Sequence, residues 1–564
     1  MQDERLQRTI SSALWSAYAD ALGFPTELAS ATTVERRIGS MSSNHLVDWK
    51  RMVGGRSGAI VSLPAGTYSD DTQLRLATSR AIRSDGFFDV ESFSKVELPV
   101  WLCYALGAGR GSKKAAASLI NKNIAWFSNF YPNYVDGGGN GAAMRIQPHV
   151  WAAPDPSKKE QFLPDVIRNA ISTHGHLRGI VGAVIHALSL ASIFTNKSIP
   201  NMEFWGDSSK EIIDIKSIIE GDYELSTFWL PTWETKSNTT LTQALEKIKE
   251  EWLDVVYSAN KVISSNQNSG SDLYKEIVTE CGGLNEYERG SGLKCAFFSN
   301  VAAFLYQKDE PKKVIQDVVN FLGSDTDTIG TMVGALLGAL HHEKLPSESI
   351  QDAYYISCEA KRLFNISQGL NADTHHYPDL LYWQPAKVIV DTVSKKGNRL
   401  VLDGVSNVKK IINIFHAKQK GISWVWAELE IGQHVLCKIR TSLTSDFFHD
   451  ERIGFSEGER NNNVNLIGDT ISFDFFRESQ PEGNIVSTKK NILGNESKPL
   501  VSSAVGDDYL DKITDEVIKS GFDKDILASR LLETAEMTNG IELSIGFVSI
   551  IVKARRARLK KKIK

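Results

Sequence analysis

Residues 323–340 read GSDTDTIGTMVGALLGAL, an acidic, hydroxyl-bearing start that runs into an apolar helix. Gly330, Gly334 and Gly338 recur at four-residue spacing, so they share one face of that helix. Each glycine costs a helix roughly 1 kcal/mol relative to alanine, a loss that tight packing offsets. The stretch therefore predicts a helix that another helix backbone approaches closely, with Asp325 and Asp327 at its start.

A second acidic start lies earlier in the chain, where residues 66–72 read GTYSDDT and lead into the helical pattern QLRLA. Taken alone, each start is typical of a helix N-cap, because Ser and Asp side chains satisfy free backbone N–H groups and suit the helix dipole. Core packing explains the glycines of the later helix. It does not explain why a second start carries both acids and hydroxyls.

Together the two starts supply four carboxylates and several hydroxyls, with no His or Cys among them. An all-oxygen set of this kind suits Mg²⁺ or Mn²⁺ and argues against zinc. Four carboxylates brought close together would repel one another without cations. Two metal ions about 3.5–4 Å apart would neutralise them and create a hydrolytic centre.

A glycine-rich segment lies between the two acidic starts. Residues 136–145 read DGGGNGAAMR, and the backbone N–H groups of such a loop suit a phosphate or diphosphate when a helix follows. A flexible turn is the alternative interpretation. Residues 172–176 read STHGH and offer two histidines, for which a capped core residue is the alternative.

Residues 1–372 are predicted to form an all-α domain. Its helical segments have apolar residues at helical spacing; they are Thr72–Ile82, Val166–Ala170, His174–Ile193, Leu241–Val262 and Thr328–His342. The stretch 196–240 is polar and irregular, which indicates an insertion in this domain.

The character of the sequence changes near residue 375, and a smaller β-rich domain is predicted for residues 380–478. Short runs rich in Val, Ile and Trp alternate with glycine-containing turns there; the runs are Ala386–Val393, Arg399–Leu402, Ile422–Ile431, Gln433–Arg440 and the alternating Ile471, Phe473 and Phe475. A polar linker over 479–506 and a helical segment with a basic tail over 507–564 complete the predicted layout.

The bulk properties exclude several classes of protein. A chain of 564 residues is too long for a single core, and its net charge of −4 gives no global attraction to nucleic acid or anionic membranes. Its five cysteines contain no C-x-x-C pair, which argues against a disulfide framework or a zinc site. The N-terminus lacks a signal-peptide core, and the apolar run 329–340 is too short to span a bilayer. We expect a soluble, cytoplasmic protein without membrane contact.

The basic tail is a local exception to this balanced charge. Residues 553–564 read KARRARLKKKIK. Charge runs of this kind are usually solvated and disordered, which is the first interpretation. The second is an arm that binds nucleic acid or an acidic partner, with binding that weakens steeply as salt increases.

The motifs occur in a fixed order over roughly residues 10–345: YADALGFPTE at 18–27, SDDT at 69–72, GNGAAMR at 139–145, STH at 172–174 and SDTDTIG at 324–330. In this order they resemble the ADP-ribosylglycohydrolase family, over the N-terminal two-thirds of the chain. The resemblance implies an all-α fold with a binuclear Mg²⁺ centre in a cleft that binds ADP-ribose or an ADP-ribosylated substrate. It implies hydrolysis of the N- or O-glycosidic bond between ADP-ribose and a protein side chain or nucleic acid.

The resemblance also assigns roles to residues, and it rests on the motifs position by position. It implies that Ser69, Asp70, Asp71, Asp325, Asp327 and Thr328 bind the two metal ions, and that Glu27, Asp71 and Asp325 are catalytic. The implied substrate-binding residues are Gly137, Gly138, Gly139, Asn140, Gly141, Met144, Arg145, His174, Ser291 and Gly292. Ser69 replaces a more usual threonine but keeps the hydroxyl, so we expect the metal site to be retained.

Two other functions fit the same sequence. The first is a non-catalytic ADP-ribose-binding protein, which the intact acidic motifs disfavour. The second is a two-metal nucleotide phosphohydrolase; the one adjacent His-Asp pair, His449-Asp450, lies in the β-rich part without partner ligands.

Overall fold

The computed structural model describes residues 2–265, 270–444, 506–537 and 540–562. The chain divides into two compact units, Met1–Gly468 and Asp469–Lys564, and each is treated separately below. The predicted strand around Ile471, the pair His449-Asp450 and residues 479–505 of the predicted linker lie outside the described residues.

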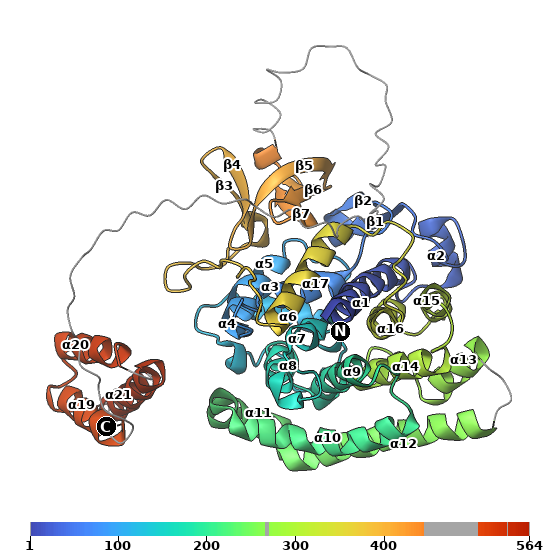
Figure 1. Ribbon diagram of the computed structural model, residues 1–564. Helices are drawn as coiled ribbons and strands as arrows, with labels where there is room; N and C mark the ends of the chain where they lie inside the picture. Colours follow the sequence, from blue (N-terminus) through green and yellow to red (C-terminus); the bar gives the residue numbers. More distant parts are fainter. Residues whose placement is uncertain (1, 266–269, 445–505, 538–539, 563–564) are drawn as a thin grey trace, which may run out of the picture. The chain divides into compact units, whose positions relative to one another are not determined.

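The first unit is mostly helical (Figure 1). Its first half contains α1 (Gln2–Gly23), α2 (Ala31–Ile38), α3 (Asp70–Arg80), α4 (Val90–Ser92), a π-helical turn (Phe93–Glu97), α5 (Leu98–Trp101), α6 (Arg110–Leu119), α7 (Gln147–Ala152), α8 (Leu163–Ile171) and α9 (Leu177–Asn196). Its second half contains α10 (Met202–Gly221), a π-helical turn (Leu225–Trp229), α11 (Leu230–Ser237), α12 (Leu241–Ser265), α13 (Ser271–Glu280), α14 (Gly292–Leu305), α15 (Pro311–Val319), α16 (Thr326–Leu340) and α17 (Ala353–Ser367). The prediction of a mostly helical domain over residues 1–372 is confirmed, but the domain is not all-α, because residues 49–63 form an antiparallel hairpin that the sequence interpretation missed.

Helices α1 and α16 pack backbone to backbone at the centre of this unit. A Cβ atom placed on Gly334 would lie 2.4 Å from the carbonyl oxygen of Trp15, and one on Gly338 would lie 2.6 Å from that of Ser11. At the other end of the contact, a Cβ on Gly23 would lie 2.7 Å from the Cα of Asp327. The close approach predicted from the glycine spacing is therefore confirmed, and it brings the acidic start of α16 beside the end of α1.

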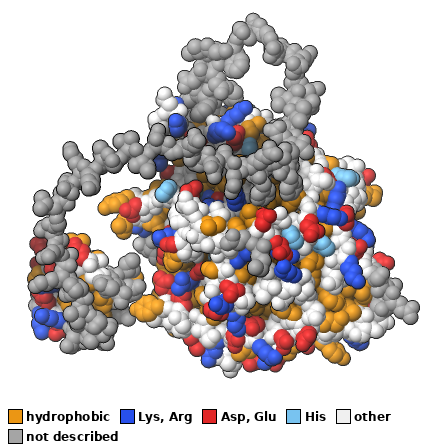
Figure 2. Space-filling model, viewed as in Figure 1, with side chains coloured by type: hydrophobic (Ala, Val, Ile, Leu, Met, Phe, Trp, Pro, Cys, Tyr) orange, Lys and Arg blue, Asp and Glu red, His pale blue; other side chains and the backbone are white. Residues whose placement is uncertain are grey.

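Helix α9 is long and apolar enough to cross a membrane by length and composition alone. Of its most apolar window, 78% is buried inside the molecule, packed against α14, α8 and α16. Core helices meet the same criterion, so this feature is weak evidence for a membrane span. Figure 2 shows acidic and basic side chains interspersed over the visible face.

The predicted irregular stretch 196–240 is helical, which corrects the sequence interpretation. Asn201 accepts a hydrogen bond from the backbone N–H of Phe204 and caps α10, and Pro231 lies in the first turn of α11. Polar residues dominate the composition because each of these helices buries only a narrow apolar face. The largest side chains of these faces are Trp205, Trp229 and Trp233, each nearly inaccessible to solvent.

Two antiparallel sheets complete the first unit. Strands β1 (Trp49–Val53) and β2 (Ala59–Leu63) form a hairpin. A five-stranded sheet in the order β3-β4-β5-β6-β7 comprises β3 (Val393–Lys396), β4 (Arg399–Leu402), β5 (Ser406–His416), β6 (Ile422–Leu429) and β7 (His434–Arg440). The helical part and this sheet belong to one compact unit, and the domain boundary near 372–380 stays a prediction.

The strand predictions were right for β4, β6 and β7 and wrong in two places. Most of the predicted strand Ala386–Val393 precedes β3 and includes a 3₁₀ turn at Ile389–Asp391. Strand β5 was missed because Lys409, Lys410 and Asn413 interrupt its alternation at two irregularities in its pairing with β6. Strand β6 is buried on both faces because its tryptophans pack on the β1–β2 hairpin.

The second unit contains α19 (Gly506–Lys519), α20 (Lys524–Ala535) and α21 (Gly540–Lys562). Its small core includes Ile513, Val517, Phe547 and Ile551. The expectation of a disordered basic tail was wrong, because α21 continues through Lys562. The apolar run 543–552 gives α21 a buried side, and the basic residues extend the same helix.

Candidate functional site

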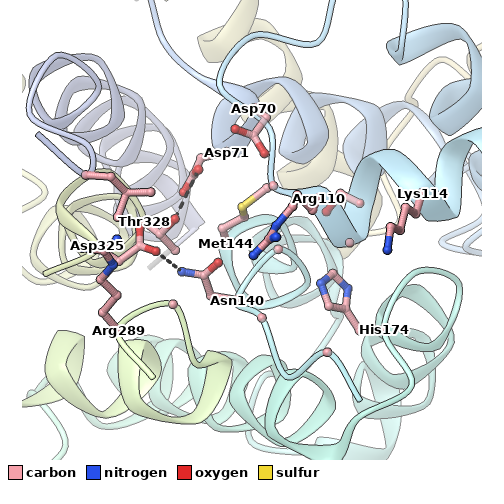
Figure 3. A pocket seen from close by; sticks show the side chains of 18 of the residues that line it. Asp70, Asp71, Arg110, Lys114, Asn140, Met144, His174, Arg289, Asp325 and Thr328 are labelled. Carbon is pink, nitrogen blue, oxygen red and sulfur yellow. Dashed lines mark hydrogen bonds between the residues drawn. The ribbon is translucent and has the colours of Figure 1, made fainter. Parts of the chain in front are cut away.

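A cleft of about 520 Å³ opens where several helix starts and loops of the first unit meet (Figure 3). The starts of α3, α6 and α16, the turn that follows α1 and the loops 131–144 and 286–290 line this cleft. Its lining residues include Glu27, Asp70, Asp71, Gly137, Gly139, Asn140, Gly141, Met144, His174, Asp325, Asp327 and Thr328. The cleft therefore brings together the two acidic starts and most of the glycine-rich loop, which lie far apart in the sequence.

The first acidic start is capped from α1, which leaves its own carboxylates available. Asp20 is fully buried and accepts hydrogen bonds from the backbone N–H groups of Ser69 and Thr72, each at 2.9 Å. These bonds satisfy donors at the start of α3 that Asp70 and Asp71 would otherwise have to satisfy. Oδ1 of Asp71 is buried and has no hydrogen-bond partner among the described residues. A buried, unpaired carboxylate oxygen is costly unless a cation or proton meets it.

The second acidic start contacts both the first start and the glycine-rich loop. The Thr328 hydroxyl lies 3.4 Å from Oδ2 of Asp71, across 257 positions of sequence. Nδ2 of Asn140 donates to Oδ2 of Asp325 at 3.0 Å, as Figure 3 shows. The backbone N–H of Thr328 donates to Oδ1 of Asp327 at 2.9 Å. Each acidic pair therefore begins a helix and also faces the shared cleft.

Burial and mutual repulsion dominate the electrostatics at the end of the cleft where the two acidic starts meet. Burial, followed by the charges of neighbouring carboxylates, raises the pKa values of Asp70, Asp71 and Asp327 well above the usual range. Burial also raises the pKa of Glu27 to about 7, opposed by the charge of Arg51, whose guanidinium lies 3.9 Å away. A cluster of this kind is stable either when protons are shared or when cations are bound.

The donor set suits a hard cation, although carboxylates alone do not enclose one. Within the described residues, no three His, Cys, Asp or Glu side chains stand close enough together to hold a metal ion. Each motif also offers a hydroxyl, Ser69 or Thr328, beside its two carboxylates. Six oxygen-bearing side chains, one of them with a buried unpaired oxygen, fit the all-oxygen preference of Mg²⁺ or Mn²⁺.

Five of the predicted site residues lie behind the lining, where they shape the cleft. The backbone N–H of Gly292 donates to the carbonyl of Gly138 at 2.9 Å, and Ser291 pairs with Gly139 in an isolated bridge. Arg145 is fully buried and donates to the carbonyl of Gly141 at 2.9 Å. The fifth is Ser69, the N-cap of α3. Their assignment as direct ligand contacts stays a prediction.

His174 lines the cleft beside the glycine-rich loop. Its Nδ1 lies 2.8 Å from the Thr173 hydroxyl, and burial lowers its pKa to about 3. The imidazole is therefore neutral at pH 7 and can offer Nε2 to a ligand as a donor or acceptor. A Cβ on Gly141 would lie 2.6 Å from the Ser112 hydroxyl and 3.1 Å from Cε1 of His174, so the close approach of the loop to these side chains favours glycine there.

The sequence interpretation missed three positively charged side chains that line the cleft. Arg110 and Lys114 lie on α6, on the side of the cleft away from Asp325, and Arg289 lies next to Asp325 (Figure 3). The signal for the first two was the run GAGRGSKK at 107–114, a glycine-rich loop that leads into a basic helix start. The capping residue Asp20 was part of a quoted motif but received no role.

A family model described as ADP-ribosylglycohydrolase matches residues 1–373. The chain belongs to the ADP-ribosylglycohydrolase family. The family suggests ADP-ribosyl glycohydrolase activity on ADP-ribosylated substrates, and its enzymes are generally metal-dependent. The resemblance inferred from the order of the motifs is thus confirmed.

Relatives of this ADP-ribosylglycohydrolase family member include two curated proteins. One is the uncharacterized protein YegU of Escherichia coli, 24% identical over 355 residues, which covers 60% of this chain and 88% of that protein. Another is the ADP-ribosylhydrolase ARH3 of Xenopus tropicalis, 26% identical over 313 residues, which covers 51% of this chain and 79% of that protein. A solved structure titled ADP-ribosylglycohydrolase-related protein complex aligns with a TM-score of 0.39 and 17% identity, over 65% of this chain and 99% of its own.

Proposed function

We propose that this protein is a Mg²⁺-dependent hydrolase that cleaves the N- or O-glycosidic bond between ADP-ribose and an acceptor. The observation that carries the proposal is the meeting of the two acidic helix starts, Thr328 with Asp71, in a cleft lined by the glycine-rich loop. Family membership supports the reaction class. The metal, its number and the acceptor are our proposals.

Two Mg²⁺ ions, or Mn²⁺ in their place, would be held by the side chains that the motifs supply. One group is Ser69, Asp70 and Asp71, and the other is Asp325, Asp327 and Thr328. Bound there, such ions supply Lewis-acid polarisation and lower the pKa of bound water. Asn140 holds Asp325 in place through its 3.0 Å hydrogen bond.

The remaining steps are assigned to the chain itself. The backbone N–H groups of the glycine-rich loop and the cations Arg110 and Lys114 would bind the diphosphate of ADP-ribose. One carboxylate among Glu27, Asp71 and Asp325 would accept the proton of the attacking water. Positioning and electrostatic stabilisation by the groups around the distal ribose would lower the energy of an oxocarbenium-like transition state.

The acceptor is proposed to be a protein side chain or a nucleic acid. Eight of residues 553–564 are Lys or Arg, which favours a nucleic acid or acidic partner at the end of α21. Retention on duplex DNA that falls steeply with salt, and that is lost when residues 553–564 are removed, supports this assignment. Retention that does not change on removal contradicts it.

The test is a panel of arginine-, serine- and nucleobase-linked ADP-ribose substrates incubated with Mg²⁺. We expect release of free ADP-ribose from at least one linkage, and its loss on chelation or in Asp71→Asn and Asp325→Asn. Asp214→Asn, an exposed carboxylate on α10 that pairs with Lys159, is the matched control and should retain full activity. Full activity of either active-site variant would contradict the assignment.

Two alternative functions are separate outcomes of the same panel. Binding of ADP-ribose without release from any linkage identifies a non-catalytic ADP-ribose-binding protein. Release of phosphate without release of ribose identifies a two-metal nucleotide phosphohydrolase. The intact acidic pairs of α3 and α16 disfavour the first alternative.

A further inference from the structure

The turn between β6 and β7 contacts the helix that carries Asp70 and Asp71. Gln433 of this turn is fully buried, and its Nε2 donates to the Tyr68 hydroxyl at 3.3 Å. Its Oε1 accepts a hydrogen bond from Nη1 of Arg80 at 2.8 Å. Tyr68 immediately precedes the N-cap of α3, and Arg80 is the last residue of α3. One side chain of the sheet therefore holds residues at both ends of this helix.

Both partners of Gln433 are fixed by stronger contacts. Arg80 makes two parallel hydrogen bonds to Glu97, at 2.7 and 2.8 Å, and both side chains are almost completely buried. The Tyr68 hydroxyl donates to Asp352 at 2.6 Å, and the backbone N–H of His434 donates to the same carboxylate oxygen at 3.0 Å. Charge-assisted hydrogen bonds of this kind are short and directional. The network leaves α3 little freedom to slide or rotate.

The placement of α3 matters because its first turn carries two of the proposed metal-binding carboxylates. A small rotation of the helix moves Asp70 and Asp71 together, relative to Asp325 and Asp327 on α16. The close packing of α16 against α1 fixes the opposite side of the cleft. The distance between the two acidic pairs therefore depends on what holds α3.

We propose that Gln433 is a positioning residue, which sets the orientation of α3 and through it the geometry of the acidic pair Asp70–Asp71. The five-stranded sheet then contributes to the geometry of the site, because it supplies the residue that orients α3 (Figure 1). This inference rests on the proposed function. Residues that orient metal ligands from behind change metal affinity or activity by about 10–100-fold when they are removed.

The experiment titrates the full-length chain with Mg²⁺ alone and follows the thermal midpoint of unfolding. Gln433→Ala is expected to raise the Mg²⁺ concentration for half-maximal stabilisation by at least about tenfold. The matched control is Trp426→Phe, which removes a 3.0 Å hydrogen bond that runs from the same sheet to Ser62 of β2 instead of to α3. The control is expected to lower the midpoint of unfolding without changing its dependence on Mg²⁺.

Tyr68→Phe gives a second route if Gln433→Ala does not fold. It keeps the aromatic ring and removes the hydroxyl through which Gln433 reaches the start of α3, so the Mg²⁺ requirement should rise in the same direction. A Mg²⁺ dependence within twofold of wild type in both variants overturns the inference. If the wild-type protein neither responds to Mg²⁺ nor releases ADP-ribose, the proposed function fails first and the inference fails with it.

Discussion

Arg110 and Lys114 give the cleft two positive charges on the side away from the acidic pairs (Figure 3). Neither side chain has an ion pair or hydrogen bond within the described part of the chain. Because they would meet the diphosphate in both the ground state and the transition state, Arg110→Ala should raise KM by about tenfold and leave kcat nearly unchanged. Steady-state kinetics on the cleaved linkage measure both constants.

Lys210→Ala is the control for that variant, since Lys210 is an exposed lysine of α10 that pairs with Asp207 of the same helix. It should leave both constants unchanged. A fall in kcat with unchanged KM in Arg110→Ala would instead mean that the guanidinium acts only in the transition state. That result would contradict a diphosphate-binding role.

The role of a residue in the site could be predicted where a motif combined several chemistry-bearing residue types, as in SDDT and SDTDTIG. The chemistry of Asp71 and Asp325 followed from their joint pattern, and the structure places both in one cleft. Asp20 was not predictable as a cap because its partners, Ser69 and Thr72, lie about 50 positions away. Arg145 belongs to a motif that suggests a ligand contact, but only the tertiary structure shows its donors used within the protein.

At the scale of elements, the glycine face of α16 is open to a direct test. Gly334→Ala places a methyl group 2.4 Å from the carbonyl oxygen of Trp15, so α1 and α16 must move apart. The free energy of unfolding should fall by about 1–3 kcal/mol, although alanine has the higher helix propensity. Urea unfolding followed by far-ultraviolet circular dichroism measures the change.

Gly206→Ala on α10 distinguishes the effect of steric contact between helices from the effect of helix propensity. A Cβ at this position meets no atom within 4 Å. The substitution should therefore raise the free energy of unfolding by about 0.5–1 kcal/mol through helix propensity alone. Equal effects of the two substitutions on the free energy of unfolding would mean that α1 and α16 can move apart at little cost.

Elements were predictable where one face is strongly apolar, as in α9, α12 and α16. The stretch 196–240 was misjudged because each of its helices buries few residues, and the partners of its buried tryptophans lie far away in sequence: Trp229 donates to the Tyr134 hydroxyl and Trp233 to the carbonyl of Gly175. Strand β5 was missed because irregular pairing with β6 breaks its period-two pattern. In both cases packing against a distant element decides the local structure.

At the scale of the whole molecule, a histidine–carboxylate pair joins the sheet to the helical part. Nδ1 of His434 on β7 lies 2.6 Å from Oδ1 of Asp352, beside the start of α17. The hydrogen bond to Asp352 raises the pKa of His434 above its usual value of 6.5. Because the folded pKa exceeds the unfolded one, the pair stabilises the fold fully below about pH 6.5, and this contribution is lost as the pH rises through the raised pKa.

The variant His434→Gln tests the stability that protonation of His434 contributes, since glutamine can still donate to Asp352 but does not titrate. Its thermal midpoint should lie below that of the wild-type protein at about pH 5.5, and the difference should shrink steadily toward about pH 9. Taking the difference between the two proteins cancels the titration of all other groups that the substitution leaves unchanged. A difference that stays constant or grows with pH would show that the pair is not charged in the folded protein, and that uncharged contacts such as the backbone hydrogen bond from His434 to Asp352 join the sheet to the start of α17.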